Sequence, residues 1–128
     1  MTNSTALAKK AIILFGHGSR DALWHLPIQA VAERIRITSP STTVSCAYLE
    51  LTEPSLGDAA ADLIASDVSE ITILPMFLGV GRHAREDLPA LITELKQNHP
   101  HTTFQVQPAV GENSQVLDLL AEIALSSH

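Results

Sequence analysis

Short apolar runs and longer amphipathic segments alternate along the chain. Residues 11–15 form a continuous apolar run, which is typical of a strand that is covered on both faces. Residues 21–38 then carry apolar side chains at roughly helical spacing, and the Ser-Pro-Ser stretch at residues 39–41 ends that pattern. The first unit of the chain is therefore predicted to be a strand, a loop and a helix.

The same alternation occurs three more times. Strands are expected at residues 43–49, 70–75 and 103–106, and helices at residues 55–66, 82–98 and 114–125. Because Pro89 is poorly tolerated inside a helix unless it lies in the first turn, the regular part of the third helix is expected to begin near Asp87. An unusually apolar loop, residues 76–81, precedes this helix.

Four strand-helix units predict an α/β fold with a four-stranded parallel sheet and helices on both faces. We take the strand order to be the common 2-1-3-4, in which the chain reverses direction between the first and third strands and a crevice opens above that point. A chain of 128 residues is long enough for one domain and too short for two of ordinary size. Residues 1–128 are therefore expected to form a single domain.

Composition and charge narrow the class of protein. Hydrophobic residues make up 45% of the chain and charged residues 17%, which is ordinary for a globular domain. The net charge of −6 argues against nucleic acid as a partner, because phosphate binding normally needs a basic face. Every apolar run is shorter than the roughly 20 residues that cross a bilayer, so no membrane association is expected.

A cytoplasmic location is the default expectation. The single cysteine, Cys46, excludes an internal disulfide and a cysteine-based zinc cage, and fits a reducing compartment. The first ten residues place two lysines after a mildly apolar stretch, which is the reverse of a secretory signal.

Side chains that could bind a metal ion lie at the ends of the predicted strands. His17 follows the first strand between two glycines, Glu50 closes the second strand, and His83 lies where the loop after the third strand meets its helix. Because the carboxyl ends of parallel strands share one edge, these three side chains are candidate ligands of one first-row divalent metal ion. A loop hydrogen bond for His17, a solvated Glu50 and a helix-start role for His83 stay open as alternatives.

Three motifs then match a known family. Residues 16–20 read Gly-His-Gly-Ser-Arg, residues 48–51 read Tyr-Leu-Glu-Leu, and residues 75–83 read Pro-Met-Phe-Leu-Gly-Val-Gly-Arg-His, followed by Asp-Leu-Pro at residues 87–89. Over about residues 12–110 the chain resembles the CbiX/SirB family of class II chelatases, in its short single-domain form. The resemblance implies insertion of Co²⁺, Fe²⁺ or, in some relatives, Ni²⁺ into sirohydrochlorin for cobalamin or sirohaem synthesis.

The same resemblance implies partners and roles. The metal ion is a substrate, no tightly bound cofactor is expected, and two copies are expected to form a homodimer with one cleft. His17, His83 and Glu50 are the expected metal ligands and catalytic groups, and which histidine acts as the base stays open. The expected substrate-binding residues are Ser19, Arg20, Phe77, Leu78, Gly79, Gly81 and Arg82. The chain lacks the histidine-rich run and the iron-sulfur cysteines found in some relatives.

Two other functions stay open. The protein could carry a metal ion or a tetrapyrrole without catalysing insertion. It could also be a phosphohydrolase that is phosphorylated on His17, although Gly16 occupies the position where such enzymes usually have an arginine.

Other conspicuous side chains lie outside the motifs. Trp24 and Tyr48 are expected to pack against the substrate, in the core or in a dimer contact. The remaining histidines are expected at the surface and not as ligands; they are His25, His99, His101 and His128.

Overall fold

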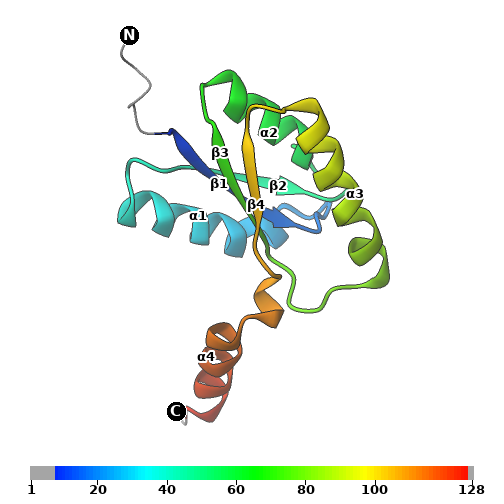
Figure 1. Ribbon diagram of the computed structural model, residues 1–128. Coiled ribbons are helices and arrows are strands. Elements are labelled where there is room, and N and C mark those ends of the chain that lie inside the picture. Colours follow the sequence, from blue (N-terminus) through cyan, green and yellow to red (C-terminus); the bar gives the residue numbers. More distant parts are fainter. Residues whose placement is uncertain (1–7, 127–128) are drawn as a thin grey trace.

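Four parallel strands form one sheet at the centre of the molecule (Figure 1). β1 (Lys10–Gly16) lies between β2 (Thr43–Tyr48) and β3 (Glu70–Pro75), and β4 (Thr103–Val106) pairs with the outer side of β3. The order is β2-β1-β3-β4, and every pairing is parallel. The predicted α/β class and the predicted strand order are both confirmed.

The computed structural model describes residues 8–126, and for His83 it describes only the backbone. Residues 1–7 and 127–128 lie outside this description, and with them most of the segment considered as a secretory signal and His128. Within the described part, no helix has the length and apolar character needed to cross a bilayer.

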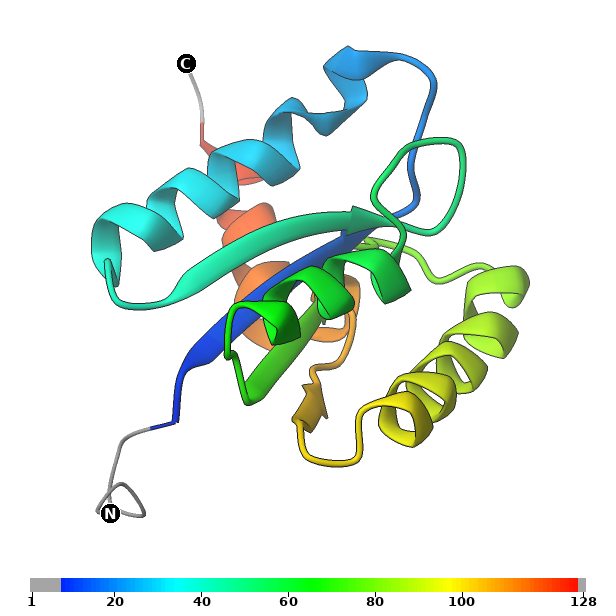
Figure 2. The same cartoon turned by 90° about the horizontal axis from the view of Figure 1, so that it is seen from above.

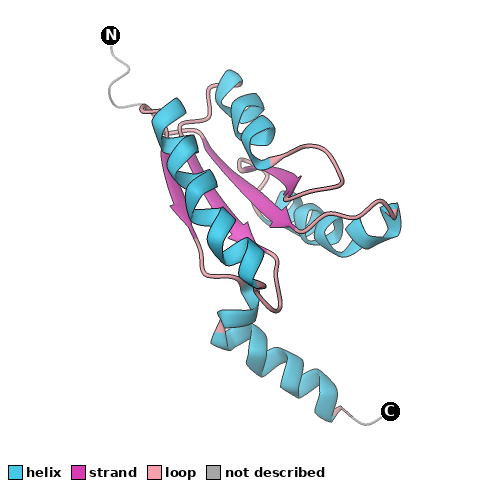
Figure 3. Ribbon diagram, turned by 90° about the vertical axis from the view of Figure 1, so that its right-hand side faces the viewer, coloured by secondary structure: helices cyan, strands magenta, loops and turns pink. Residues whose placement is uncertain are grey.

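Helices lie on both faces of the sheet (Figure 2). α1 (Leu26–Thr38) covers one face over β1 and β2, and α2 (Leu56–Ala65) and α3 (Arg82–Asn98) cover the other. α4 (Ser114–Leu125) instead projects away from the end of the sheet toward which the strands run (Figure 3). The predicted two-sided covering is confirmed for the first three helices.

The central strand β1 is buried from both sides because its side chains alternate between two clusters. Ile13 and Phe15 belong to the cluster beneath α2 and α3, where Phe15 contacts the ring of Phe77 at a centroid distance of 5.8 Å. Leu14 belongs to the smaller cluster beneath α1. Apolar residues at successive positions are therefore all buried, as expected for a central parallel strand.

The segment predicted as one helix over residues 21–38 begins differently. A 3-10 helix, η2 (Ala22–His25), comes first, and the Asp21 side chain caps it by accepting a hydrogen bond from the backbone N–H of Leu23 at 3.0 Å. Because a 3-10 helix has three residues per turn, its side chains do not follow the 3.6-residue spacing. The expectation that His25 lies at the surface is wrong, since its side chain is only 8% exposed.

The expected start of α3 near Asp87 is also wrong. The helix begins at Arg82 and continues through Pro89. Residue Arg85, whose carbonyl would accept the hydrogen bond that Pro89 cannot donate, is exposed, as is Pro89 itself. Water can satisfy that carbonyl, so the interruption is tolerated.

Candidate functional site

Three neighbouring strands end at the same level. Gly16 at the end of β1 is in register with Tyr48 of β2, and Phe15 is in register with Pro75 of β3. The residues that follow these strands therefore meet at one edge, and β1 lies between β2 on one side and β3 on the other, so the strand order reverses at β1. Ligands of open α/β sheets bind at such a switch point.

His17 stands at the centre of this edge. It directly follows β1 and is exposed, and its ring lies 4.1 Å from the ring of Phe77, with the two planes at 30°. Phe77 itself is 1% exposed. In this structure the Phe77 side chain is part of the core and supports the imidazole from behind, and its contact with a substrate stays a prediction.

Glu50 lies in the loop after β2, and that loop is joined to the loop carrying His17. The backbone N–H of Glu50 donates to the carbonyl of His17 at 3.0 Å, while the Glu50 side chain is exposed. Gly18 has φ +94°, and a Cβ there would lie 1.8 Å from the Glu50 carbonyl oxygen. Only glycine permits this close approach, so the motif brings the two loops together.

The start of α3 supplies the third predicted ligand. Gly81 is its N-cap residue, and Arg82 and His83 are its first two residues. Among the described side chains, no three histidine, cysteine, aspartate or glutamate residues are close enough to hold a metal ion. The side chain of His83 is outside that set, so the site of His17, Glu50 and His83 stays a prediction.

The apolar loop after β3 is anchored from the far end of the chain. The N–H of Gly111, in the 3-10 helix η3 (Val110–Glu112), donates to the Phe77 carbonyl at 3.0 Å. A Cβ at Gly111 would lie 1.6 Å from the Leu78 carbonyl oxygen. The Leu78 side chain is exposed, and a Cβ at Gly79 or Gly81 would meet only open space. These two glycines are therefore not required by packing.

The polar residues of the motifs have different roles in the structure. The Ser19 hydroxyl accepts a hydrogen bond from the N–H of Asp21 at 3.0 Å and so shapes the turn into η2. Arg20 is exposed beside it. Arg82 is exposed too, and its Nε lies 3.2 Å from Glu86 Oε1, an ion pair that solvent weakens.

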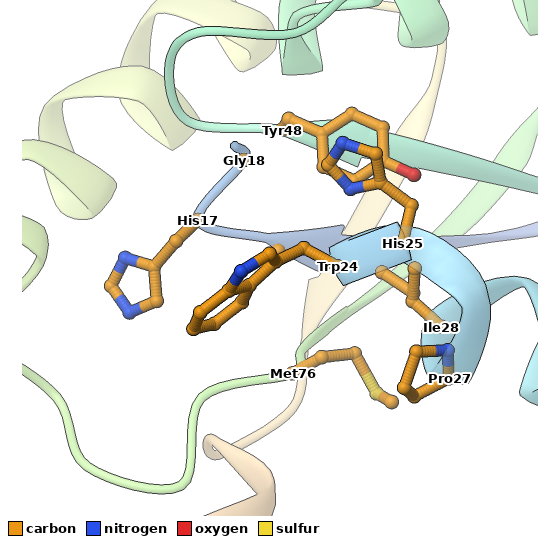
Figure 4. A pocket seen from close by; sticks show the side chains of 9 residues that line it. His17, Gly18, Trp24, His25, Pro27, Ile28, Tyr48 and Met76 are labelled. Atoms are coloured by element: carbon orange, nitrogen blue, oxygen red, sulfur yellow. The ribbon is translucent and has the colours of Figure 1, made fainter. Parts of the chain in front are cut away.

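A pocket opens beside His17, between the end of β1 and the start of α1 (Figure 4). Its volume is about 180 Å³. Trp24 lines it with a side chain that is 73% exposed. The remaining lining residues are Gly16, His17, Gly18, His25, Pro27, Ile28, Tyr48 and Met76. The pocket is therefore lined both by a candidate metal ligand, His17, and by apolar side chains.

Two side chains near this pocket have pKa values raised by burial. Burial raises the pKa of the Tyr48 hydroxyl, and the nearby Cys46 adds to the shift. Burial also raises the pKa of the Cys46 thiol, partly offset by the Arg36 guanidinium. Both groups therefore stay protonated and uncharged at neutral pH.

Two residues of this region were missed in the sequence. His25 and Thr52 contact each other beneath the loops that carry His17 and Glu50, with His25 Nε2 lying 3.2 Å from Thr52 Oγ1. Pro27 was the signal that could have placed His25 outside α1. Proline favours the first turn of a helix, so the residues before Pro27 are expected to form a separate turn.

Comparisons with known proteins agree with the fold and with the family that the motifs indicate. The sequence model of the CbiX family matches residues 11–126. The crystal structure of the CbiX protein from Marinobacter aquaeolei VT8, titled a putative cobalamin (vitamin B12) biosynthesis protein, is 32% identical with a TM-score of 0.77; the match covers 90% of this chain and 93% of that one.

Curated relatives carry a more specific name. The sirohydrochlorin cobaltochelatase of Methanopyrus kandleri is 32% identical over 82 residues, which are 64% of this chain and 57% of that protein. The sirohydrochlorin cobaltochelatase of Sulfolobus acidocaldarius is 25% identical over 113 residues, 88% of each chain. The family match extends from the first strand to the end of α4, and this chain belongs to the CbiX family.

Proposed function

We propose that this protein inserts a divalent metal ion, Co²⁺ or Fe²⁺, into sirohydrochlorin. The observation that carries the proposal is the exposed His17 at the switch point of the sheet, with the Glu50 loop bonded to its carbonyl. The relatives from Methanopyrus kandleri and Sulfolobus acidocaldarius are named sirohydrochlorin cobaltochelatases, which supports the same reaction. The metal ion, whether Co²⁺, Fe²⁺ or Ni²⁺, is a substrate, and no tightly bound cofactor is proposed.

The reaction requires metal delivery and proton removal at one place. A free-base tetrapyrrole loses two N–H protons as the metal ion enters the ring. A neutral imidazole can bind the ion, and once the ion has left it can accept a proton at neutral pH. We assign these tasks to His17 and His83, with Glu50 as a third ligand or a proton acceptor.

The macrocycle needs an apolar surface larger than the pocket in one chain. The pocket of about 180 Å³ is smaller than the roughly 300–1,000 Å³ of ordinary ligand pockets. We place the ring across the pocket mouth, against Trp24 and Met76, which line the pocket, and we propose that the exposed segment of Leu78 and Gly79 covers its other side. Open space beside Gly79 and Gly81 leaves room for this approach.

The substrate's carboxylates need cationic partners because the chain as a whole carries a net charge of −6. Arg20 and Arg82 are exposed at the site edge, and guanidinium groups bind carboxylates in a two-pronged geometry. The exposed Arg82–Glu86 ion pair is weak enough to exchange for a substrate carboxylate. Ser19 adds a hydrogen-bonding hydroxyl.

We further propose that two copies form a homodimer. None of the α4 side chains is buried, although the helix is rich in leucine and isoleucine. On the sheet face beside α1, the apolar side chains of Ile12, Leu74 and Met76 are only partly buried. Burying apolar area is the main gain in association, and a second copy offers the matching surface for both.

A dimer also enlarges the site. α4 leaves the sheet at the end toward which the strands run (Figure 3). His17 follows β1 at that same end, so we place a copy bound through α4 beside the pocket that His17 lines. Two such copies enclose a larger cleft than one chain. We place this dimer in the cytoplasm, which suits a chain whose single cysteine cannot form an internal disulfide.

The test is the rate of metal insertion into sirohydrochlorin with Co²⁺ and with Fe²⁺. The wild-type protein is expected to accelerate insertion, and His17→Ala and His83→Ala are expected to lose most of the acceleration. His101→Ala is the matched control, because His101 is exposed in the turn before β4, at the opposite end of the sheet. Tight binding of metal or tetrapyrrole without acceleration by the wild type would instead identify a carrier.

A further inference from the structure

Apart from Tyr48, His25 is the only buried side chain with a polar or charged group among the described residues. It ends η2, just before α1, and its ring packs against the ring of Tyr48 at a centroid distance of 4.4 Å and an angle of 52°. Tyr48 is the last residue of β2, so the imidazole is fixed against the strand that leads to Glu50. Burying such a ring is costly unless its polar atoms have partners.

The partners of His25 come from two different loops. Its Nε2 lies 3.1 Å from the carbonyl oxygen of Ser19 and 3.2 Å from Thr52 Oγ1. The Thr52 hydroxyl donates to the same Ser19 carbonyl. Since a carbonyl only accepts hydrogen bonds, Nε2 carries the proton in this arrangement and donates it. We call these three residues, His25, Ser19 and Thr52, the His25 clamp.

The clamp holds a strained turn. Leu51 has φ +68°, a region that residues with a side chain rarely adopt, and the N–H of Thr52 donates to the carbonyl of Glu50 at 2.8 Å. Such conformations persist only where the surroundings fix them. The Thr52 side chain is the part of this turn that the clamp grips, one residue after Leu51 and two after Glu50.

We infer that His25 is a positioning residue of the chelatase site, which holds Glu50 beside His17 by clamping Thr52 to Ser19. This inference rests on the proposed function. The clamp joins the loop after β1 to the loop after β2 on the buried side, and the bond from the Glu50 N–H to the His17 carbonyl joins them at the edge. Groups behind metal ligands commonly fix ligand orientation in this way.

The test compares two His25 variants. His25→Leu removes the N–H donor and replaces the imidazole with an apolar side chain of similar size. His25→Gln keeps an N–H donor at about the position of Nε2. His25→Leu is expected to lower kcat for Co²⁺ insertion about tenfold or more, with the KM for sirohydrochlorin changed by less than about twofold. His25→Gln is expected to recover most of the lost kcat.

Thr52 provides an independent test of the same clamp, because its side chain is only partly buried and its replacement is less of a risk to folding. Thr52→Val is expected to lower kcat as His25→Leu does, and Thr52→Ser to retain it. Because both residues act through one contact, the double variant His25→Leu with Thr52→Val is expected to lose little more than either single variant.

Hydrogen exchange reports the positioning without any substrate. The N–H groups of Glu50 and Thr52 are expected to exchange faster in His25→Leu than in the wild type, and at the wild-type rate in the control His101→Leu. His101 is exposed at the opposite end of the sheet, where its replacement leaves the clamp intact.

The outcomes separate the inference from the proposed function. An active wild type with unchanged kcat in His25→Leu and Thr52→Val would overturn the inference and leave the proposed function standing. Equal loss in His25→Leu and His25→Gln would also overturn it, because the donor would then not be the essential feature. A wild type that does not accelerate insertion would overturn the proposed function, while the exchange rates would still test the clamp.

Discussion

The imidazole of His17 lies against the ring of Phe77, with the two centroids 4.1 Å apart and the planes inclined at 30°. Phe77 is almost completely buried and packs on Phe15 of β1, the strand that ends just before His17. The exposed side chain of His17, a candidate metal ligand, is therefore held in place by a residue of the core. A side chain held in this way loses less conformational entropy when it binds a ligand.

Replacing Phe77 tests this support. Phe77→Ala is expected to lower the free energy of unfolding by about 3–5 kcal/mol, because it leaves a cavity in the core. Phe77→Leu keeps most of the volume and is expected to cost about 1.5 kcal/mol or less, yet to weaken Co²⁺ binding about tenfold. Urea unfolding and Co²⁺ titration measure the two effects. Unchanged Co²⁺ affinity in a folded Phe77→Leu would show that the ring contact is not needed.

The glycines of the motifs are expected to differ in their tolerance of a side chain. Gly18→Ala places a Cβ against the Glu50 carbonyl at a positive φ, and is expected to cost about 3 kcal/mol or more in the free energy of unfolding. Gly79→Ala meets open space and is expected to change stability by less than about 0.5 kcal/mol. Denaturant unfolding of the two variants, side by side, checks this difference. Equal stability of the two would contradict it.

Several features of the fold could be read from the sequence because local and global signals agree. The continuous apolar run of β1 predicts a strand buried on both faces, and both of its clusters are present. β3, β4 and α4 begin and end at the predicted residues. The edge position of His17 followed from the same argument, because the apolar run stops at the glycine before it.

Other features depend on contacts that local patterns do not encode. Pro89 indicated a later start for α3, yet solvent exposure of Pro89 and Arg85 lets the helix continue through it. The burial of His25 depends on Ser19 and on Thr52, which is 27 residues away in sequence. The sequence alone does not distinguish a phenylalanine in the core from one that lines a binding site. Only the packing of Phe77 identifies it as a core residue.

The Cys46 thiol is expected to react slowly with alkylating reagents. Burial raises its pKa above the ordinary value, so at pH 8 less of it is in the reactive thiolate form than in an unfolded chain. Its alkylation rate is expected to rise only at higher pH, and to reach the ordinary rate at pH 8 when the protein is unfolded in urea. Mass spectrometry of the time course measures both rates. Equal rates in the folded and unfolded protein would contradict the expected protection.

The homodimer is expected to depend on α4. Replacing two exposed apolar residues, Leu120→Gln with Ile123→Gln, is expected to weaken dimerisation about 100-fold or more. The control, Asp118→Asn with Glu122→Gln, changes polar residues of the same helix and is expected to leave the dimer intact. Sedimentation over a range of concentrations measures the dissociation constant. A wild type that stays monomeric, or a Leu120 and Ile123 variant that dimerises as tightly as the wild type, would contradict this role of α4.

The central claim is that side chains from three neighbouring strand ends bind one metal ion that is then inserted into the substrate. A crystal structure of the wild-type protein with Co²⁺, with the ion located by its anomalous scattering, tests it most directly. The expected result is one ion at about 2 Å from ring nitrogens of His17 and His83, with the Glu50 carboxylate in the same site. Cobalt bound elsewhere, or His17 and His83 too far apart to share an ion within one chain or across the dimer, would contradict it.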